Sequence, residues 1–267
     1  MTKILTLAVG LFLFIEARAQ TIDTIVQVDG HKLHFKIRQG QGIPILFEAG
    51  NGDDGSVWEV LLDSIHQATG TTLITYDRAG LGQSEIDTAN ISFQSEIENL
   101  ETALKQLGYD GNVFLVSHSF GGFYASLFAY RNPDRVKGAI FIDPALPCFF
   151  TPEWSQGFID AIKASDWSMI KQYKPGLYYV LQHLKKITAF MQDKYISPDI
   201  PLTLIAAEQL LPMVKPYETE NWKSCLKDFG NAEGRKYVLA TGATHKVWNE
   251  RPDVVTLEVI QLYEAVK

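Results

Sequence analysis

Short apolar runs alternate with longer amphipathic segments along most of the chain. Continuous apolar runs bounded by turn residues are typical of strands that are buried on both faces of a sheet. Residues 24–28 and 32–37 instead alternate polar and apolar side chains around Asp29-Gly30, which predicts an antiparallel hairpin at one edge. Runs of this kind predict buried strands at 43–47 and 112–116, and further strands are predicted at 71–76, 136–142, 201–207 and 236–239.

Between these strands, apolar residues recur at helical spacing, which predicts helices at 57–68, 91–107, 120–130 and 252–266. Strands that alternate with helices indicate right-handed crossovers, and therefore a mainly parallel sheet with helices on both faces. We expect one α/β domain with a sheet of about eight strands, of which the first pair is antiparallel.

One long segment interrupts this alternation. Residues 144–198 contain no convincing strand, and they are helix-like and rich in aromatic side chains. The segment is several times longer than an ordinary connection between a helix and a strand. It predicts a helical cap over about residues 144–199, with an ordinary pair of sheet-covering helices as the alternative.

The first residues have the pattern of a secretory signal peptide. Lys3 precedes an apolar run over residues 4–15, and Ala17-Arg18-Ala19 then provides a cleavage site after Ala19. The run is shorter than the ~20 residues that a membrane-spanning helix needs. We expect residues 1–19 to be removed and residues 20–267 to be a secreted or periplasmic domain without a stable membrane anchor; the alternatives are an uncleaved anchor or a buried helix.

Charge and cysteine content narrow the function classes. The formal net charge is −7 and Lys and Arg do not cluster along the sequence, which disfavours a nucleic-acid partner. Cys148 and Cys225 could be oxidised in an exported protein, but they lie far apart in sequence, and two buried free thiols are the favoured expectation. No metal-ligand spacing occurs, so neither a metal nor an organic cofactor is expected.

The candidate nucleophile lies in Ser117-His118-Ser119-Phe120-Gly121-Gly122, between a predicted buried strand and a predicted helix. A sharp strand-to-helix turn needs small residues two positions before and two positions after its central residue. Ser119 meets this requirement with Ser117 and Gly121. Ser117 does not, because Leu115 would occupy the crowded position. The alternative is that one of the serines merely caps the helix.

In their combined order, the motifs of the chain resemble the α/β-hydrolase superfamily. The matching segments are 48–52, 76–84, the serine turn, 132–136, 242–245 and 251–255. The resemblance implies that residues 48–52 form an oxyanion loop, with the backbone N–H groups of Asn51 and Phe120 as donors. Gly50 lets the backbone approach closely, whereas Ala49 stands where the family commonly has a histidine.

His245 follows a predicted strand in a glycine-rich loop, and it is the expected general base. Surface or packing roles are expected for the histidines at 31, 34, 66 and 183, namely His31, His34, His66 and His183. His118 is expected to have a structural or tuning role.

The identity of the catalytic acid is left open, because Leu210 stands where the family usually has an aspartate. Asp143 and Glu208 both end predicted strands between Ser119 and His245, and Asp143 is favoured. Asp77 is expected to hold its own loop with Arg78.

We therefore expect a serine hydrolase that forms an acyl-enzyme and cleaves a small ester with an apolar or aromatic group. Haloalkane dehalogenases and epoxide hydrolases need a carboxylate nucleophile, which Ser119 disfavours. One alternative is an aminopeptidase or amidase with a cap carboxylate for the substrate amine, from Glu153, Asp160 or Asp166. Another is a non-catalytic binding protein of the same fold. The oligomeric state stays open.

Overall fold

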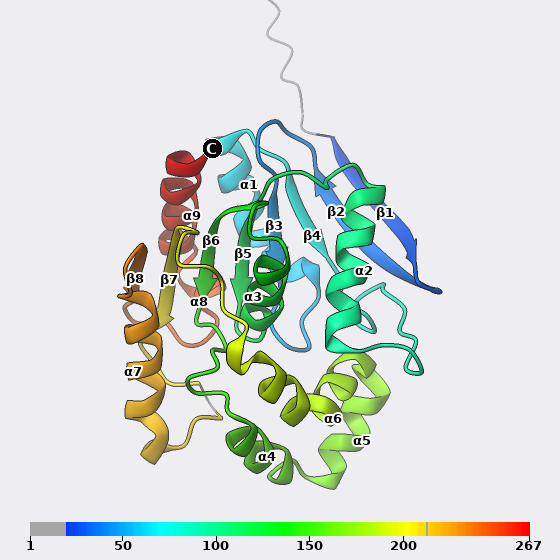
Figure 1. The fold of residues 1–267 in the computed structure, drawn as a ribbon, viewed down its shortest axis with the longest axis vertical. Helices are drawn as coiled ribbons and strands as arrows, with labels where there is room; N and C mark the ends of the chain where they lie inside the picture. Colours follow the sequence, from blue (N-terminus) through cyan, green and yellow to red (C-terminus); the bar gives the residue numbers. More distant parts are fainter. Residues whose placement is uncertain (1–19, 212) are drawn as a thin grey trace, which may run out of the picture.

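A computed structural model describes residues 20–211 and 213–267. In it, a central sheet lies between two layers of helices (Figure 1). The predicted signal peptide lies outside the described residues. The described strands form one sheet in the order β1-β2-β4-β3-β5-β6-β7-β8. Their bounds are β1 Thr21–Val28, β2 His31–Arg38, β3 Ile45–Glu48, β4 Leu73–Tyr76, β5 Val113–His118, β6 Val136–Ile142, β7 Leu202–Ala207 and β8 Arg235–Ala240.

The pairing pattern confirms the predicted sheet. β1 and β2 form the antiparallel hairpin, β2 also runs antiparallel to β4, and the remaining neighbours are parallel. β3, β4, β5 and β7 are buried at every position, which explains their continuous apolar sequences. β1 lies at the edge and alternates exposed and partly buried side chains along most of its length.

Helices cover both faces of the sheet (Figure 1). Side chains of α1 and α9 pack with one face, and those of α2, α3 and α7 pack with the other. The short helix α8 precedes α9. The bounds are α1 Glu59–Thr69, α2 Phe93–Gln106, α3 Gly121–Arg131, α7 Thr219–Gly230, α8 Val247–Glu250 and α9 Pro252–Val266.

The segment between β6 and β7 is helical, as the sequence predicts. It contains α4 (Pro152–Asp160), α5 (Ala164–Tyr173) and α6 (Pro175–Phe190), and they lie beyond the carboxyl ends of the parallel strands (Figure 1). In an open parallel sheet, ligands bind at that edge. We refer to residues 144–199 as the cap.

The structure also corrects two expectations. Cys148 and Cys225 form a disulfide with a Cα–Cα distance of 5.7 Å, so the expectation of two free thiols is wrong. The bond forms because the connection that leaves β6 for the cap meets α7, a helix that the sequence interpretation did not include. The predicted helix at 57–68 begins instead with a 3-10 turn, Gly55–Trp58, before α1.

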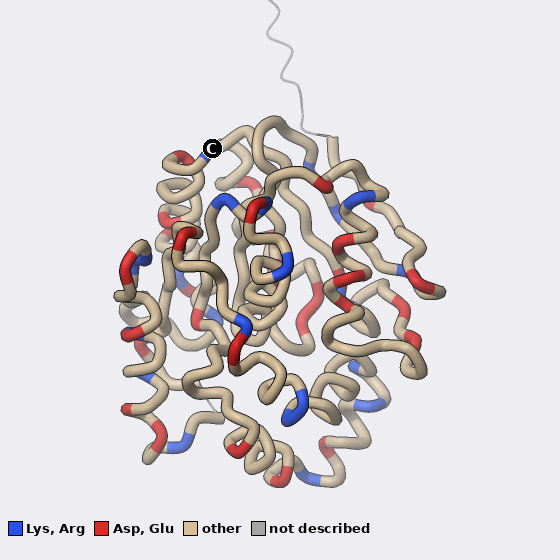
Figure 2. Tube along the Cα trace, in the orientation of Figure 1, with Lys and Arg blue, Asp and Glu red and all other residues tan. Residues whose placement is uncertain are grey.

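The surface is mixed in charge. Over the described residues, Lys and Arg lie among Asp and Glu on the domain and on the cap, without gathering into one basic band (Figure 2). None of the described helices is long and apolar enough to cross a membrane.

Candidate active site

Ser119 lies at a strained turn between β5 and α3. Its φ of 54° is in the left-handed region, which is costly for a residue with a Cβ atom. A Cβ atom on Gly121 would lie 2.5 Å from the carbonyl oxygen of Ala49 and 2.6 Å from that of Glu48. The structure therefore confirms that the turn needs a small residue two positions after Ser119.

Three side chains from different elements form one hydrogen-bonded chain. His245 Nε2 lies 2.8 Å from Ser119 Oγ, and His245 Nδ1 lies 2.6 Å from Asp143 Oδ2. Asp143 directly follows β6 and is fully buried, whereas the His245 side chain is 19% exposed. Because the carboxylate accepts a hydrogen bond from Nδ1–H, the lone pair of Nε2 faces the serine hydroxyl.

Backbone contacts hold Asp143 in place. Its φ is 42°, also in the left-handed region, and its Oδ1 accepts a hydrogen bond from the backbone N–H of Ala207 at 3.2 Å. The strain and the contact fix the carboxylate next to the end of β7.

Glu208, the other candidate acid, has a different place. Its Oε2 accepts a hydrogen bond from the backbone N–H of Gly242 at 2.7 Å. That contact supports the loop that carries His245 and leaves Glu208 outside the Ser119–His245–Asp143 chain. Of the two candidates, the structure thus brings Asp143 to the histidine.

The predicted oxyanion loop lies beside Ser119. Asn51 and Phe120 line the same cavity as the serine, and neither backbone N–H donates a hydrogen bond to another described residue. Gly50 packs against the His118 ring, where a Cβ atom would lie 2.8 Å from Nδ1. The two amides can therefore serve a ligand oxygen at the serine.

The cavity at Ser119 extends under the cap and has a volume of about 420 Å³. Aromatic cap residues line it, as expected, and of the three cap carboxylates considered above only Asp166 is in its lining. Asp160 instead accepts a hydrogen bond from Gln156, and Glu153 is exposed. The lining comprises Asn51, Ser119, Phe120, Phe150, Trp154, Phe158, Ala161, Ile162, Asp166, Ile170, Leu177, Leu181, Leu184, Leu211 and Met213.

Comparison with known proteins agrees with this architecture. Residues 43–173 match the sequence family described as alpha/beta hydrolase fold. The chain also superposes on a thermophilic esterase from Thermogutta terrifontis with a TM-score of 0.66, at 19% identity, over 93% of this chain and 99% of that one. The chain belongs to the α/β-hydrolase superfamily.

Relatives of this superfamily member have diverse names. It is 27% identical to the uncharacterised protein YqjL of Bacillus subtilis over 88% of this chain and 90% of that protein. It is 23% identical to a haloalkane dehalogenase of Agrobacterium fabrum over 74% of this chain and 60% of that protein. Their names do not agree with one another or with that of the superposed esterase, so superfamily membership does not by itself fix the reaction of this protein.

In this hydrolase, the buried Arg78 holds the oxyanion loop through its backbone carbonyl groups. Arg78 Nη1 donates to Ala49 O at 2.6 Å and to Glu48 Oε1, and Arg78 Nη2 donates to Gly50 O at 2.5 Å. The Tyr76 hydroxyl donates a hydrogen bond to the same glutamate. The sequence interpretation missed this role of Arg78, which it had assigned to the loop of Asp77. An Asp-Arg pair directly after a predicted strand was the available signal.

The same network reaches α2 through an aromatic side chain. The Arg78 guanidinium lies 4.6 Å from the centre of the Tyr124 ring, and the Tyr124 hydroxyl donates to Glu96 Oε2 at 2.6 Å. Burial raises the pKa of Glu96 from 4.5 to about 7, although the tyrosine hydrogen bond and Arg78 oppose the rise.

His118 contacts the loop of the candidate base. Its ring centre lies 4.5 Å from that of His245, and its Nε2 lies 2.9 Å from the His245 carbonyl oxygen, so Nε2 is placed to donate. Burial, and then the nearby His245, lower the pKa of His118 to about 3. The ring is therefore neutral near pH 7, which fits the structural or tuning role expected for it.

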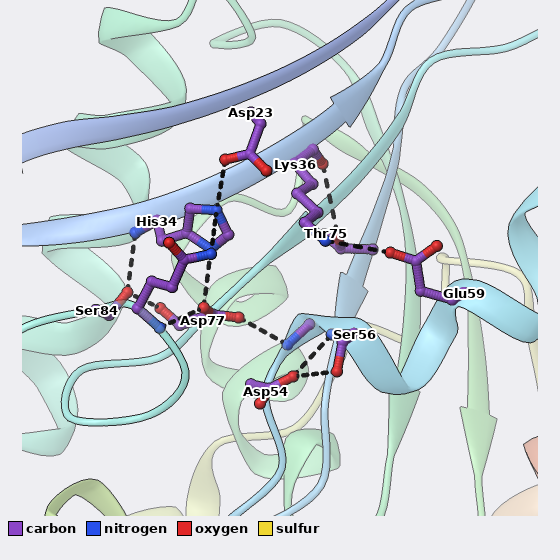
Figure 3. Close-up of polar contacts among 11 residues, drawn as sticks. Asp23, His34, Lys36, Asp54, Ser56, Glu59, Thr75, Asp77 and Ser84 are labelled. Atoms are coloured by element: carbon purple, nitrogen blue, oxygen red, sulfur yellow. Dashed lines mark hydrogen bonds and ion pairs between the residues drawn. The ribbon is translucent and has the colours of Figure 1, made fainter.

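A second network, centred on His34, holds the loop that follows β4 and begins at Asp77 (Figure 3). His34 is buried, with Nδ1 2.8 Å from Asp77 Oδ2 and Nε2 2.9 Å from Asp23 Oδ1. Asp77 also accepts hydrogen bonds from the backbone N–H groups of Gly55 and Gln83. Asp77 thus holds its own loop, as expected, and ties it to the β1–β2 hairpin and to the 3-10 turn after the oxyanion loop.

Proposed function

We propose that this protein is a serine hydrolase that cleaves carboxylic esters of small apolar substrates through an acyl-enzyme. The observation that carries the proposal is the continuous hydrogen-bonded chain from Ser119 through His245 to Asp143. A serine hydroxyl is a poor nucleophile until a neighbouring base removes its proton, and His245 Nε2 faces that hydroxyl. Ser119, His245 and Asp143 are therefore the proposed catalytic residues.

In the first step, Ser119 Oγ attacks the ester carbonyl carbon while its proton moves to His245 Nε2. The carbonyl electron pair moves onto oxygen, and the backbone N–H groups of Asn51 and Phe120 stabilise the resulting oxyanion. The buried Asp143 carboxylate keeps the histidine in the required tautomer and stabilises the imidazolium that forms.

In the second step, the bond between carbon and the leaving oxygen breaks, and His245 gives its proton to the departing alcohol. The acyl group remains on Ser119. Water then attacks the acyl carbon as His245 accepts one of its protons, and collapse of that intermediate releases the acid and returns the proton to Ser119 Oγ. No redox change occurs, and the enzyme is regenerated.

The identity of residue 119 favours acyl transfer over the other hydrolase chemistries considered. Dehalogenation and epoxide opening need a carboxylate at the turn, where this chain has a serine. The largely aliphatic and aromatic cavity suits an ester with an apolar acid or alcohol part.

A fluorophosphonate probe tests the proposal directly, because it reacts with activated serines. We expect rapid labelling of the wild type and hydrolysis of p-nitrophenyl esters, with both lost in Ser119→Ala. Ser117→Ala, on the same turn, is the matched control and should keep both. Failure of the wild type to be labelled, or equal labelling of Ser119→Ala, would refute the serine mechanism.

We also propose that residues 1–19 are a signal peptide and that the mature protein is exported. The Cys148–Cys225 disulfide supports this, because disulfides persist mainly in oxidising compartments. When the full chain is expressed in a host that can export it, N-terminal sequencing of the exported protein should give a chain that begins at Gln20. A chain recovered with residues 1–19 intact would contradict the proposal.

A further inference from the structure

The cavity at Ser119 combines an apolar wall with a single negative charge. Most of its lining side chains are aliphatic or aromatic, and among the described lining residues Asp166 is the charged one. A carboxylate exposed to an otherwise apolar cavity loses part of its hydration without gaining an opposite charge there. A bound group of positive charge would supply that partner.

Asp166 makes no ion pair and no short hydrogen bond with the described residues. It is half-buried in the first turn of α5, and from the described residues its carboxylate accepts one hydrogen bond, from Ser165 Oγ at 3.2 Å. A negative charge in the first turn also favours the helix, because it faces the positive end of the helix dipole. Helix stabilisation would be served equally by a carboxylate that faces solvent, and so it does not explain why this one lines the cavity.

Aromatic rings of the cap provide a second feature that favours cations. Trp154 and Phe158 lie parallel with ring centres 5.5 Å apart, and Phe150 meets Trp154 at 4.7 Å. All three line the cavity with Asp166. The faces of aromatic rings attract ammonium groups, most strongly where water is excluded. Carboxylate and rings together are the chemistry that recognises an ammonium group on an apolar body.

We propose that the substrates of this site carry a positively charged ammonium group on an apolar body, and that Asp166 selects them. The inference rests on the proposed acyl transfer at Ser119 and specifies its substrate class. An anionic group of the same size should be rejected, because it would meet Asp166 with no described basic side chain in the lining.

Two pairs of equal-shape esters test the selection in the wild-type protein. On the acid side, the pair is the p-nitrophenyl esters of ε-aminocaproic acid and heptanoic acid. On the alcohol side, it is hexanoylcholine and the dimethylbutyl ester of hexanoic acid. In at least one pair we expect kcat/KM for the cationic ester to exceed that of its neutral partner by about tenfold. A preference for the neutral ester in both pairs would overturn the proposal.

Asp166→Asn keeps the shape of the side chain and removes its charge. It should abolish the cationic preference, so that the ratio of kcat/KM for the cationic ester to that for the neutral ester falls to about one. Asp160→Asn, on the neighbouring helix and outside the cavity lining, is the matched control and should change neither ester. An equal loss on both esters in Asp166→Asn, with an unchanged melting temperature, would assign Asp166 a role other than charge selection and refute the proposal.

Asp166→Lys provides a second variant that does not depend on loss of activity. It should reverse the preference, so that the p-nitrophenyl monoester of adipic acid becomes a better substrate than the aminocaproate ester. Retention of the wild-type order would contradict the proposal. A failure of the proposed function is distinct from these results, because it would abolish turnover of the neutral esters and fluorophosphonate labelling of the wild type.

Discussion

Asp143 differs from Glu208 in its surroundings more than in its chemistry. It is fully buried at the end of β6 and faces His245 Nδ1, whereas Glu208 supports Gly242 from an exposed position. The sequence placed both carboxylates at strand ends in the right chain order. The choice between them depends on how far each strand extends and on the φ angle of Asp143. The periodicity of apolar residues in the sequence indicates neither.

We predict that Asp143→Asn lowers kcat by about 10³–10⁴-fold, because an asparagine amide can donate to Nδ1 and hold the histidine in the wrong tautomer. Glu208→Gln keeps an acceptor for Gly242 and should leave kcat within about threefold. Steady-state kinetics on one ester compares the two. A larger loss in Glu208→Gln than in Asp143→Asn would reverse their assignment.

Glu96 gives stability an unusual pH dependence. Its carboxyl ionises near 4.5 when unfolded but near pH 7 when folded. Between these values the folded state keeps the proton that the unfolded state has lost, so this contribution to stability falls as pH rises and is fully lost above about pH 7. Glu96→Gln can still accept the Tyr124 hydrogen bond without that loss.

The variant should therefore gain about 2–4 °C in melting temperature over the wild type at pH 8 and little at pH 5. Thermal unfolding across this pH range measures the difference. Glu98→Gln, an exposed position on the same helix, is the control and should lack this pattern. Equal shifts for Glu96→Gln at both pH values would exclude a raised pKa as the cause.

At the scale of elements, the contact between the serine turn and the oxyanion loop is the tightest part of the site. A methyl group at Gly121 would meet two backbone carbonyl oxygens of that loop, neither of which can rotate away. Gly121→Ala should cost about 1–3 kcal/mol in unfolding free energy and lower kcat through displacement of the loop.

Gly157→Ala tests the same exchange in α4, where no described residue outside the adjacent part of the helix lies within 4 Å of the new methyl group. It should be neutral or stabilise the protein by up to about 1 kcal/mol, because alanine favours a helix. Urea unfolding and ester kinetics distinguish the two variants. Similar effects at both positions would show that close packing at Gly121 is unimportant.

The elements show what the sequence could predict. The segment that forms β6 is mostly apolar, and the bounds of this strand match the prediction at both ends. α7 was missed although Trp222, Cys225 and Leu226 recur at helical spacing and are buried on one side. That signal is short and lies among charged residues, so it becomes clear only when β7 and β8 supply a surface for the helix to cover.

At the scale of the whole molecule, the disulfide joins the beginning of the cap to α7 across 77 positions. No sequence pattern could predict it, because the two cysteines meet only through the tertiary fold. Beside it, Phe149 and Phe150 pack against Trp222. The bond thus connects the cap to the domain at a point next to the substrate cavity.

We predict that the double variant Cys148→Ser, Cys225→Ser loses about 2–4 kcal/mol of unfolding free energy, since the unfolded chain regains the freedom of a long loop. Urea unfolding measures this, and wild-type protein in a reductant should show the same loss. An unchanged unfolding midpoint in both would show that the bond does not restrain the unfolded state.

The covalent connection also has a consequence for damage to the backbone. Ser119 and Asp143 precede Cys148 in the chain, whereas His245 follows Cys225. A protease that cut the cap anywhere between the two cysteines would generate two polypeptides, with the serine and the aspartate on one and the histidine on the other. The sulfur bridge would keep these fragments in a single particle, and only a reducing gel would reveal the break.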